Sequence, residues 1–243
     1  MNKKKKGHLH PMTQMINEIN TIFSDMDFEF AEGPEMDSEY YNFDALNVPK
    51  DHPARSMQDT FWIKDKEKML MRTHTSNAQV RYMENNKPPI RIVSPGKVFR
   101  NEATDATHEA QFHQIEGLMI DETTTLGTLK GVLKIFFEKF FNKEVGVRLR
   151  PSFFPFVEPG IEVDMSCFKC EGKGCSVCKN TGWIEVLGAG MVHPNVLKAG
   201  GIDPEKYQGF AFGGGIERLG MLKYGIDDIR LFFNGDLQFV NQF

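Results

Sequence analysis

The sequence has no long apolar run. No segment reaches the roughly 18 consecutive apolar residues that a membrane-spanning helix needs. The basic start MNKKKKGHLHP is not followed by an apolar segment, so a secretory signal is not expected. An internal repeat is also missing. These absences predict a cytoplasmic globular protein with no membrane partner.

The chain lacks an excess of positive charge as well. Its formal net charge is −4 over 243 residues, and without Lys3–Lys6 the remaining chain carries −8. An acidic body argues against a protein whose main task is to grip a phosphate backbone broadly. We expect a basic tail at residues 1–10 and one domain over residues 11–243.

Cysteine is scarce, and all of it lies in one place. Cys167, Cys170, Cys175 and Cys178 form the pattern C-x2-C-x4-C-x2-C. This spacing is typical of a structural zinc site with four thiolate ligands, and it predicts a zinc insertion at residues 167–180. Free thiols on a loop are the alternative, and a redox disulfide pair is a lesser one.

Hydrophobic periodicity predicts a chain of mixed secondary structure. Helices are expected from Pro11 to about Met26, and at 75–85, 124–142, 195–200 and 216–224, the second one capped by Thr75. Strands are expected at 28–31, 68–73, 90–93, 97–101, 111–121, 147–153, 161–165, 183–191 and 210–213, with a long loop at 33–60. Because strands follow one another without a helix after each, the order favours an α+β domain with an antiparallel or mixed sheet.

Two of the predicted strands carry an unusual mixture of side chains. Arg100 and Glu102 lie two residues apart on the first, and Phe112, Gln114 and Glu116 alternate along the second. Each set therefore points to one face of the sheet. A guanidinium suits bidentate phosphate binding, and an aromatic ring can stack on a flat ligand. An exposed hairpin with mixed charges is an equally weighted alternative.

A glycine run then leads from a strand into a helix. Gly213, Gly214 and Gly215 allow a ligand to approach the backbone, and Glu217 and Arg218 fall in the first helical turn. The run does not have the G-x-x-x-x-G-K-[ST] pattern of a phosphate-binding loop, so by itself it is weak evidence.

Together the two segments resemble motifs 2 and 3 of class II aminoacyl-tRNA synthetases. The shared patterns are R-x-E with a following F-x-x-x-E, and G-G-G-I-E-R. Longer segments, including LMRTHTSNAQVRYM, RPSFFPFVEPGIEVDM and LGAGMVHPNVL, resemble the catalytic core of the bacterial phenylalanyl-tRNA synthetase alpha subunit. The resemblance runs from about His8 to Phe243. It implies an antiparallel sheet flanked by helices, and a phenylalanine–tRNA ligase that makes phenylalanyl-adenylate from phenylalanine and ATP.

The resemblance also implies roles on the ATP side. Arg100 would hold the α-phosphate, while Arg218 and His108 would bind the phosphates beyond it. Glu102 would read the adenine amino group, and Phe112 would stack on adenine opposite Arg218. Positioned cations of this kind stabilise the charge that builds up during attack on the α-phosphate.

On the amino-acid side, the resemblance implies a polar set for the ammonium and carboxylate, an aromatic pair and a small residue at the pocket floor. These are His74, Ser76, Gln114, Glu116, Phe154, Phe156 and Ala211. Glu158 would bind Mg²⁺, since that ion prefers oxygen ligands. Without the resemblance, phenylalanines such as Phe154 and Phe156 are more often core than pocket residues, and histidines such as His74 and His108 are more often hydrogen-bonded surface or core residues than functional ones.

The implied partners are a beta subunit, in a heterotetramer, and tRNA(Phe), whose terminal 2′-hydroxyl would receive phenylalanine. Motif 1, about residues 12 to 34, would form an interface with the beta subunit or with a second copy. The family's N-terminal helical arm has no counterpart in the sequence, so we expect weakened tRNA binding and better support for amino-acid activation than for charging. Two alternatives stay open, a related adenylate-forming paralogue and a catalytically silent assembly or tRNA-binding module.

Overall fold

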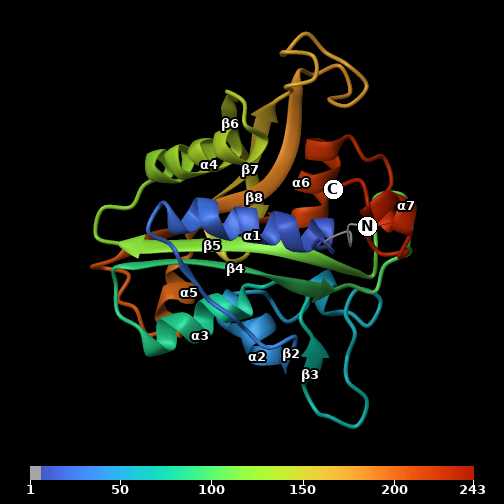
Figure 1. Ribbon diagram of the computed structural model, residues 1–243. Coiled ribbons are helices and arrows are strands. Elements are labelled where there is room, and N and C mark those ends of the chain that lie inside the picture. The colour runs from blue at the N-terminus through green and yellow to red at the C-terminus, as the bar shows by residue number, and fades with distance from the viewer. Residues whose placement is uncertain (1–6) are drawn as a thin grey trace.

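A seven-stranded sheet forms the centre of the molecule in the computed structural model, which describes residues 7–243 (Figure 1). The predicted basic run Lys3–Lys6 lies outside the described residues. The strand order is β1-β4-β5-β9-β8-β7-β6, and every pairing is antiparallel except the parallel pair β1–β4. The strands are β1 Glu29–Phe30, β4 Ile90–Phe99, β5 Gln111–Asp121, β6 Val147–Phe154, β7 Val157–Ser166, β8 Trp183–Val192 and β9 Gln208–Gly215. The expected α+β architecture is confirmed.

Helices cover both faces of the sheet (Figure 1). One face carries α1 Pro11–Ser24, α4 Leu126–Phe141 and α6 Ile216–Tyr224. The other carries α2 Glu39–Asn42, α3 Asn77–Asn85 and α5 Pro194–Ala199, with a small hairpin of β2 Met36–Ser38 and β3 Met69–Met71. Each face therefore has its own apolar core, because successive side chains of a strand point to opposite sides.

Aromatic rings pack α1 against the sheet. Pro11 occupies the first helical turn, where its missing N–H is not needed, and the His10 ring accepts a hydrogen bond from the Met12 amide. Buried Phe23 stacks on Phe136 of α4 and Phe212 of β9, with ring centroids 4.9 and 5.5 Å apart. The predicted aromatic-rich core therefore lies between α1, α4 and the sheet.

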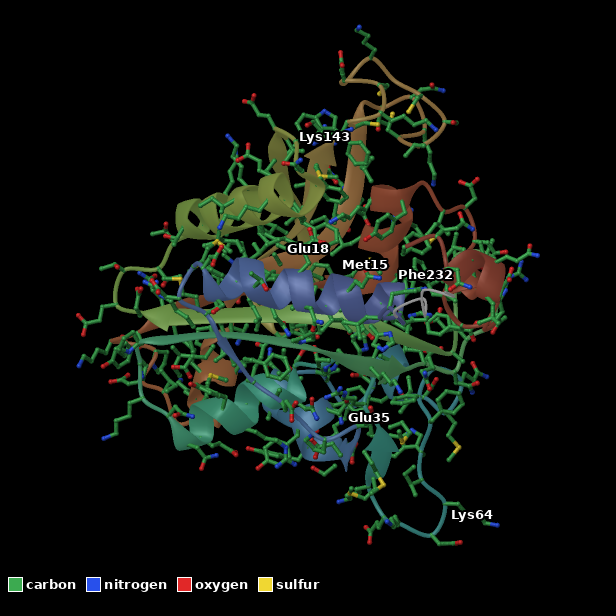
Figure 2. The ribbon with its side chains drawn as sticks, viewed as in Figure 1. Met15, Glu18, Glu35, Lys64, Lys143 and Phe232 are labelled. Carbon is green, nitrogen blue, oxygen red and sulfur yellow. The ribbon has the colours of Figure 1, made fainter. Side chains whose placement is uncertain are left out.

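Helix α6 lies close against α1, as Figure 2 shows around Met15, Glu18 and Phe232. A Cβ at Gly220 would stand 2.6 Å from the Met15 sulfur and 3.1 Å from the Phe232 ring, so this contact needs glycine. Lys223 donates to the Glu18 carboxylate at the next turn. These contacts with α1 hold α6, which begins directly after the glycine run, in place on the sheet.

Three local predictions were wrong. The strands expected at 90–93 and 97–101 are one strand, β4. Pro95 does not break it, because β1 is too short to pair with Pro95 and the missing N–H therefore interrupts no hydrogen bond on that side. Arg100 and Glu102 lie just past its end rather than within a strand. Ser76, not Thr75, precedes α3, and neither side chain caps it, because the Ser76 hydroxyl donates to Glu116 and the Thr75 hydroxyl makes no hydrogen bond among the described residues.

Some segments carry more regular structure than expected. The predicted loop at 33–60 contains β2, α2 and the 3₁₀ helices Asp44–Leu46 and Pro53–Arg55. Near the C-terminus a 3₁₀ helix, η3 Ile229–Phe232, and α7 Leu237–Val240 were not anticipated. All are shorter than the window over which periodicity is recognisable. Within residues 7–243, no helix is both long and apolar enough to cross a membrane.

Candidate active site

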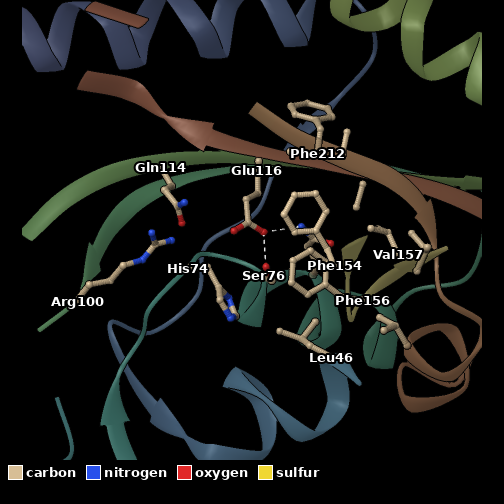
Figure 3. Close-up of a pocket in the computed structure, with 17 residues that line it drawn as sticks. Leu46, His74, Ser76, Arg100, Gln114, Glu116, Phe154, Phe156, Val157 and Phe212 are labelled. Atoms are coloured by element: carbon tan, nitrogen blue, oxygen red, sulfur yellow. Dashed lines mark hydrogen bonds between the residues drawn. The ribbon is translucent and has the colours of Figure 1, made fainter. Parts of the chain in front are cut away.

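A cavity of about 260 Å³ opens between the sheet and the layer of α2, α3 and α5 (Figure 3). One end is polar and the other is aromatic and aliphatic. Its polar lining consists of His74, Ser76, Gln79, Arg100, Gln114 and Glu116. Its apolar lining includes Leu46, Phe154, Phe156, Val157, Val192, Val196, Ala211 and Phe212. The volume lies near the lower end of the usual range for ligand pockets, as suits a small molecule.

Glu116 is the centre of the polar end. Its carboxylate accepts hydrogen bonds from the Thr75 amide at 3.0 Å, the Ser76 hydroxyl at 2.5 Å and the Gln79 amide at 2.8 Å. Gly213 stands opposite on β9, where a Cβ would come within 2.8 Å of the Glu116 side chain. Burial raises the pKa of Glu116, and the Ser76 and Thr75 donors act against that rise. A buried carboxylate fixed on one side in this way suits a cationic ligand group.

Three further side chains surround this carboxylate, and two of them carry unpaired atoms. Arg100 donates from Nε to the Thr73 carbonyl at 3.1 Å, and its guanidinium lies 5.0 Å from the Phe112 ring centroid. His74 Nδ1 and Gln114 Oε1 are buried without a hydrogen-bond partner among the described residues. Desolvation, aided by the Arg100 charge, lowers the pKa of His74 to about 3, so the ring is neutral at physiological pH. Buried unpaired polar atoms that face a cavity indicate a polar ligand.

The apolar end is built around two phenylalanines at the β6–β7 turn. Phe154 and Phe156 stack with centroids 5.9 Å apart and planes 16° apart. Gly188 of β8 lies under this pair, and a Cβ there would come within 2.9 Å of the Phe154 ring. Ala211, on β9, lines the same space. The structure thus places the predicted aromatic pair and the small residue in one wall.

A second cavity, of about 320 Å³, adjoins the first. His74, Arg100 and Phe156 line both spaces. Its other walls are Phe43, Val48, His52, Ala54, Asp59, Thr73, Asn101, Glu102 and Pro155. The three shared residues therefore mark the junction at which two ligands would meet.

The remaining predicted ATP-site residues lie outside both cavities. Phe112 is two residues from Gln114 on β5, and Gln114 pairs with Gly215 at the end of β9. Exposed Arg218 follows in the first turn of α6, whose Glu217 accepts from the His113 amide at 2.9 Å. Phe112 and Arg218 therefore flank the same end of the β5–β9 pair. His108 is exposed in the loop between β4 and β5.

Glu158 does not join these residues. Its exposed carboxylate lies 3.4 Å from His193 Nε2 and lines neither cavity. In the part of the chain that the structure describes, the four cysteines form the one group of three or more acidic, histidine or cysteine residues close enough to share an ion. The structure therefore brings no second carboxylate to Glu158.

The four cysteines converge at the far end of the β7–β8 hairpin. Their sulfur atoms all lie within 4.8 Å of one another, with 3.7 Å between Cys167 and Cys175 and between Cys170 and Cys178. Tetrahedral zinc with Zn–S bonds of about 2.3 Å requires sulfurs about 3.8 Å apart, so the site fits zinc and no disulfide is formed. Burial opposes ionisation of Cys178, but the Cys175 and Gly182 amides outweigh it and lower its pKa to about 6. These N–H donors favour a thiolate ligand.

Some lining residues were not anticipated. Gln79 follows Ser76 by three residues, so one turn of α3 brings both side chains to Glu116. The helix predicted at 75–85 already places Ser76 and Gln79 on one face, so this contact could have been found from the sequence. Leu46 and Val196 reach the cavity from segments distant in sequence, and no local sequence pattern predicts their place there.

Comparisons with known proteins agree with this geometry. The family of class II tRNA synthetase core domains (F) matches residues 1–243. The phenylalanine–tRNA ligase alpha subunit of Caldanaerobacter subterraneus subsp. tengcongensis is 59% identical over 239 residues, covering 98% of this chain and 70% of that protein. The chain belongs to the class II synthetase family of phenylalanine–tRNA ligase alpha subunits. The predicted family and fold class are thereby confirmed.

Other members of this phenylalanine–tRNA ligase family are similarly close. The alpha subunit of Francisella tularensis subsp. novicida is 56% identical over 240 residues, covering 99% of this chain and 70% of its own length. That of Bacillus cytotoxicus is 58% identical over 239 residues, covering 98% and 69%. A solved pyrrolysyl-tRNA synthetase from Desulfitobacterium hafniense superposes with a TM-score of 0.70 at 17% identity, over 94% of this chain and 75% of that one. That last likeness shows the fold.

Proposed function

We propose that this chain is the catalytic subunit of a phenylalanine–tRNA ligase. It joins phenylalanine to ATP, giving phenylalanyl-adenylate and pyrophosphate, and passes the phenylalanyl group to tRNA(Phe). The observation that carries the proposal is the first cavity, which has a buried carboxylate at one end and an aromatic wall at the other. No other common amino acid has an ammonium and an unsubstituted benzyl group at these two ends.

The polar residues orient the amino acid. The ammonium binds at Glu116, Gln79 and Ser76, where a charge-assisted hydrogen bond offsets the cost of burying the carboxylate. The benzyl ring lies against Phe154 and Phe156, and Ala211 sets the depth of the pocket. The carboxylate then faces Arg100, with the unpaired His74 and Gln114 atoms as further partners.

The chemistry follows from that orientation. A carboxylate oxygen of phenylalanine attacks the α-phosphorus of ATP, and the bond from that phosphorus to the bridging oxygen of pyrophosphate breaks. Arg100 stabilises the negative charge on the α-phosphate, and Arg218 and His108 hold the leaving phosphates. Adenine stacks between Phe112 and Arg218, with Glu102 at its amino group. Mg²⁺, with Glu158 as its protein ligand, would neutralise phosphate charge when bound.

The transfer step and the partners complete the proposal. The tRNA terminus would reach the activated carboxyl group where the two cavities meet, at Arg100 and His74, and its 2′-hydroxyl would displace AMP. A beta subunit, or a second copy of the chain, packs on residues 12–34. Zn²⁺ bound by the four cysteines stabilises the insertion and takes no part in catalysis.

The deciding experiment is phenylalanine-dependent ATP–pyrophosphate exchange, measured on the chain alone and with a beta subunit. We expect exchange that needs phenylalanine and is weaker with tyrosine. Arg218→Ala is the matched variant and should abolish exchange without unfolding, since Arg218 is exposed. Exchange that prefers another amino acid would indicate a paralogue. No exchange even with the beta subunit would indicate a silent module.

A further inference from the structure

The loop between β4 and β5, which carries His108, is folded around one carboxylate. Asp105 accepts hydrogen bonds from the Thr107 amide at 2.7 Å, the Thr107 hydroxyl at 2.9 Å and the His108 amide at 2.8 Å. The Asp105 amide in turn donates to the His108 carbonyl at 3.0 Å. Residues 105–108 therefore form a closed turn although both side chains are exposed.

The same carboxylate holds the His108 ring. His108 Nδ1 lies 3.0 Å from each Asp105 oxygen, so this nitrogen carries a proton and donates a hydrogen bond to the carboxylate; the Thr107 hydroxyl lies 3.1 Å from the same nitrogen. The side chain is 55% exposed, and none of its hydrogen bonds involves Nε2. Nε2 is the ring atom left to meet a ligand.

Among the described residues, Asp105 and His108 form an ion pair only with each other, while Arg230, Asp228 and Glu102 act on them at longer range. Arg230, the cation nearest the turn on η3, is engaged by Asp228 at 2.6 Å. Glu109 accepts from the Thr104 hydroxyl at 3.1 Å, and Glu102 acts on His108 only at longer range. The Ile229 amide donates to the Ala106 carbonyl at 2.9 Å and so anchors the turn on η3. A backbone hydrogen bond therefore holds the loop against η3, and the Asp105 carboxylate binds the His108 ring.

We propose that Asp105 is a positioning residue for the activation reaction, which orients His108 so that Nε2 can donate to the phosphates of ATP. This inference rests on the proposed function. The hydrogen bond to Asp105 raises the pKa of His108, which extends the charged form toward higher pH. A charge-assisted donor binds phosphate more strongly than a neutral ring.

The test is Asp105→Asn, which keeps the shape and the amide-accepting oxygen but removes the charge. In the assembly that supports exchange, we expect the KM for ATP to rise about tenfold at pH 8 while the KM for phenylalanine stays constant. The alkaline limb of the pH profile should move to lower pH. Independently of turnover, NMR titration should show a lower pKa for His108 in the variant without ligands.

Two controls make the result specific. Glu109→Gln removes a carboxylate of the same loop that does not bond to His108, and it should leave both readouts unchanged. When His108 is already replaced by Ala, Asp105→Asn should cause no additional rise in the KM for ATP. An unchanged His108 titration, or equal losses with and without the imidazole, would overturn the inference while exchange itself remains intact. Absence of exchange in the unaltered chain would instead remove the proposed function.

Discussion

Single residues set the size of the aromatic end of the first cavity. Ala211 lies on β9 beside Phe154 and Phe156, so its methyl group limits how far a ring can enter. We predict that Ala211→Gly will admit para-chloro-phenylalanine in the exchange assay, because it adds the volume of one methyl group. Ala211→Val should instead raise the KM for phenylalanine, since interiors tolerate little overpacking.

The measurement is the ratio of kcat/KM for para-chloro-phenylalanine and phenylalanine. Glycine at position 211 should raise this ratio at least about tenfold, which is the lower end of the effect of a single carbon in an apolar pocket. An unchanged ratio would mean that another residue limits the pocket. The KM for ATP should stay constant in both variants, because Ala211 lies away from Phe112 and Arg218.

The neutral state of His74 predicts an acid-sensitive fold. Burial lowers the pKa of this ring to about 3 in the folded chain, whereas the unfolded ring titrates near 6.5. Between these values the unfolded chain binds a proton that the folded chain does not, so the free energy of unfolding falls as the pH falls from 6.5 toward 3. We predict that His74→Gln will weaken this dependence, as measured by urea unfolding at pH 7.5 and pH 5.

The comparison isolates His74 because both proteins keep the same carboxylates. The raised pKa of Glu116 has the opposite effect, because it increases the free energy of unfolding as the pH falls. Glu116 is present in both proteins, so its contribution is the same in each. Parallel losses of stability in the two proteins would show that His74 titrates normally in the folded state.

At the scale of elements, the cysteine insertion is a separate unit on the sheet. It joins β7 at Ser166 to β8 at Trp183, and it turns tightly at Gly174 and Gly182, which have φ of 97° and 77°. Gly188, which lines the first cavity, lies five residues along β8 from Trp183, or about 17 Å at the usual rise per residue. The insertion is therefore far from the proposed chemistry.

We predict that Cys170→Ser will lose zinc and lower Tm by several degrees, because one missing ligand opens the four-thiolate site. Exchange at 25 °C should be largely kept. Zinc content by mass spectrometry and Tm by calorimetry check this prediction, with Ser176→Ala in the same insertion as the control. Equal zinc content in both variants would contradict a metal site, and loss of exchange below Tm would contradict a purely structural one.

At the scale of the whole molecule, we predict that the edge formed by β1 and α1 is a subunit interface. β1 pairs with β4 and has no strand on its other side among the described residues. Phe30 on this strand is 49% exposed, beside a surface hollow lined by α1 and β1 residues. An exposed aromatic ring beside a surface hollow is a feature of interaction surfaces, and on it we base the prediction that a partner packs here.

We predict that Phe30→Asp will weaken association with a beta subunit, or with a second copy, while circular dichroism stays unchanged. Analytical ultracentrifugation at several concentrations measures the assembly. Leu237→Asp is the matched control, because Leu237 is 70% exposed on α7, outside residues 12–34. Equal association of the two variants would place the interface elsewhere.

The long helices and strands, the family and the four-cysteine cluster were predictable from the sequence. Long periodic segments such as α1 and α4 were predicted because amphipathic spacing repeats over several turns. The cysteine spacing indicated a metal site because short turns bring such residues together wherever they occur. The glycine run and the Arg100–Glu116 segment indicated the family as ordered patterns along the chain.

Only the tertiary structure decided which side chains share a cavity. Leu46 and Val196 join Glu116 and Phe154 through contacts between elements far apart in sequence. Burial by those elements, not the residues' own chemistry, makes His74 neutral and leaves Gln114 Oε1 unpaired. Likewise, Asp105 is unremarkable in sequence and gains its partner because the loop closes on His108. Such relations depend on distances in space, which a linear pattern does not contain.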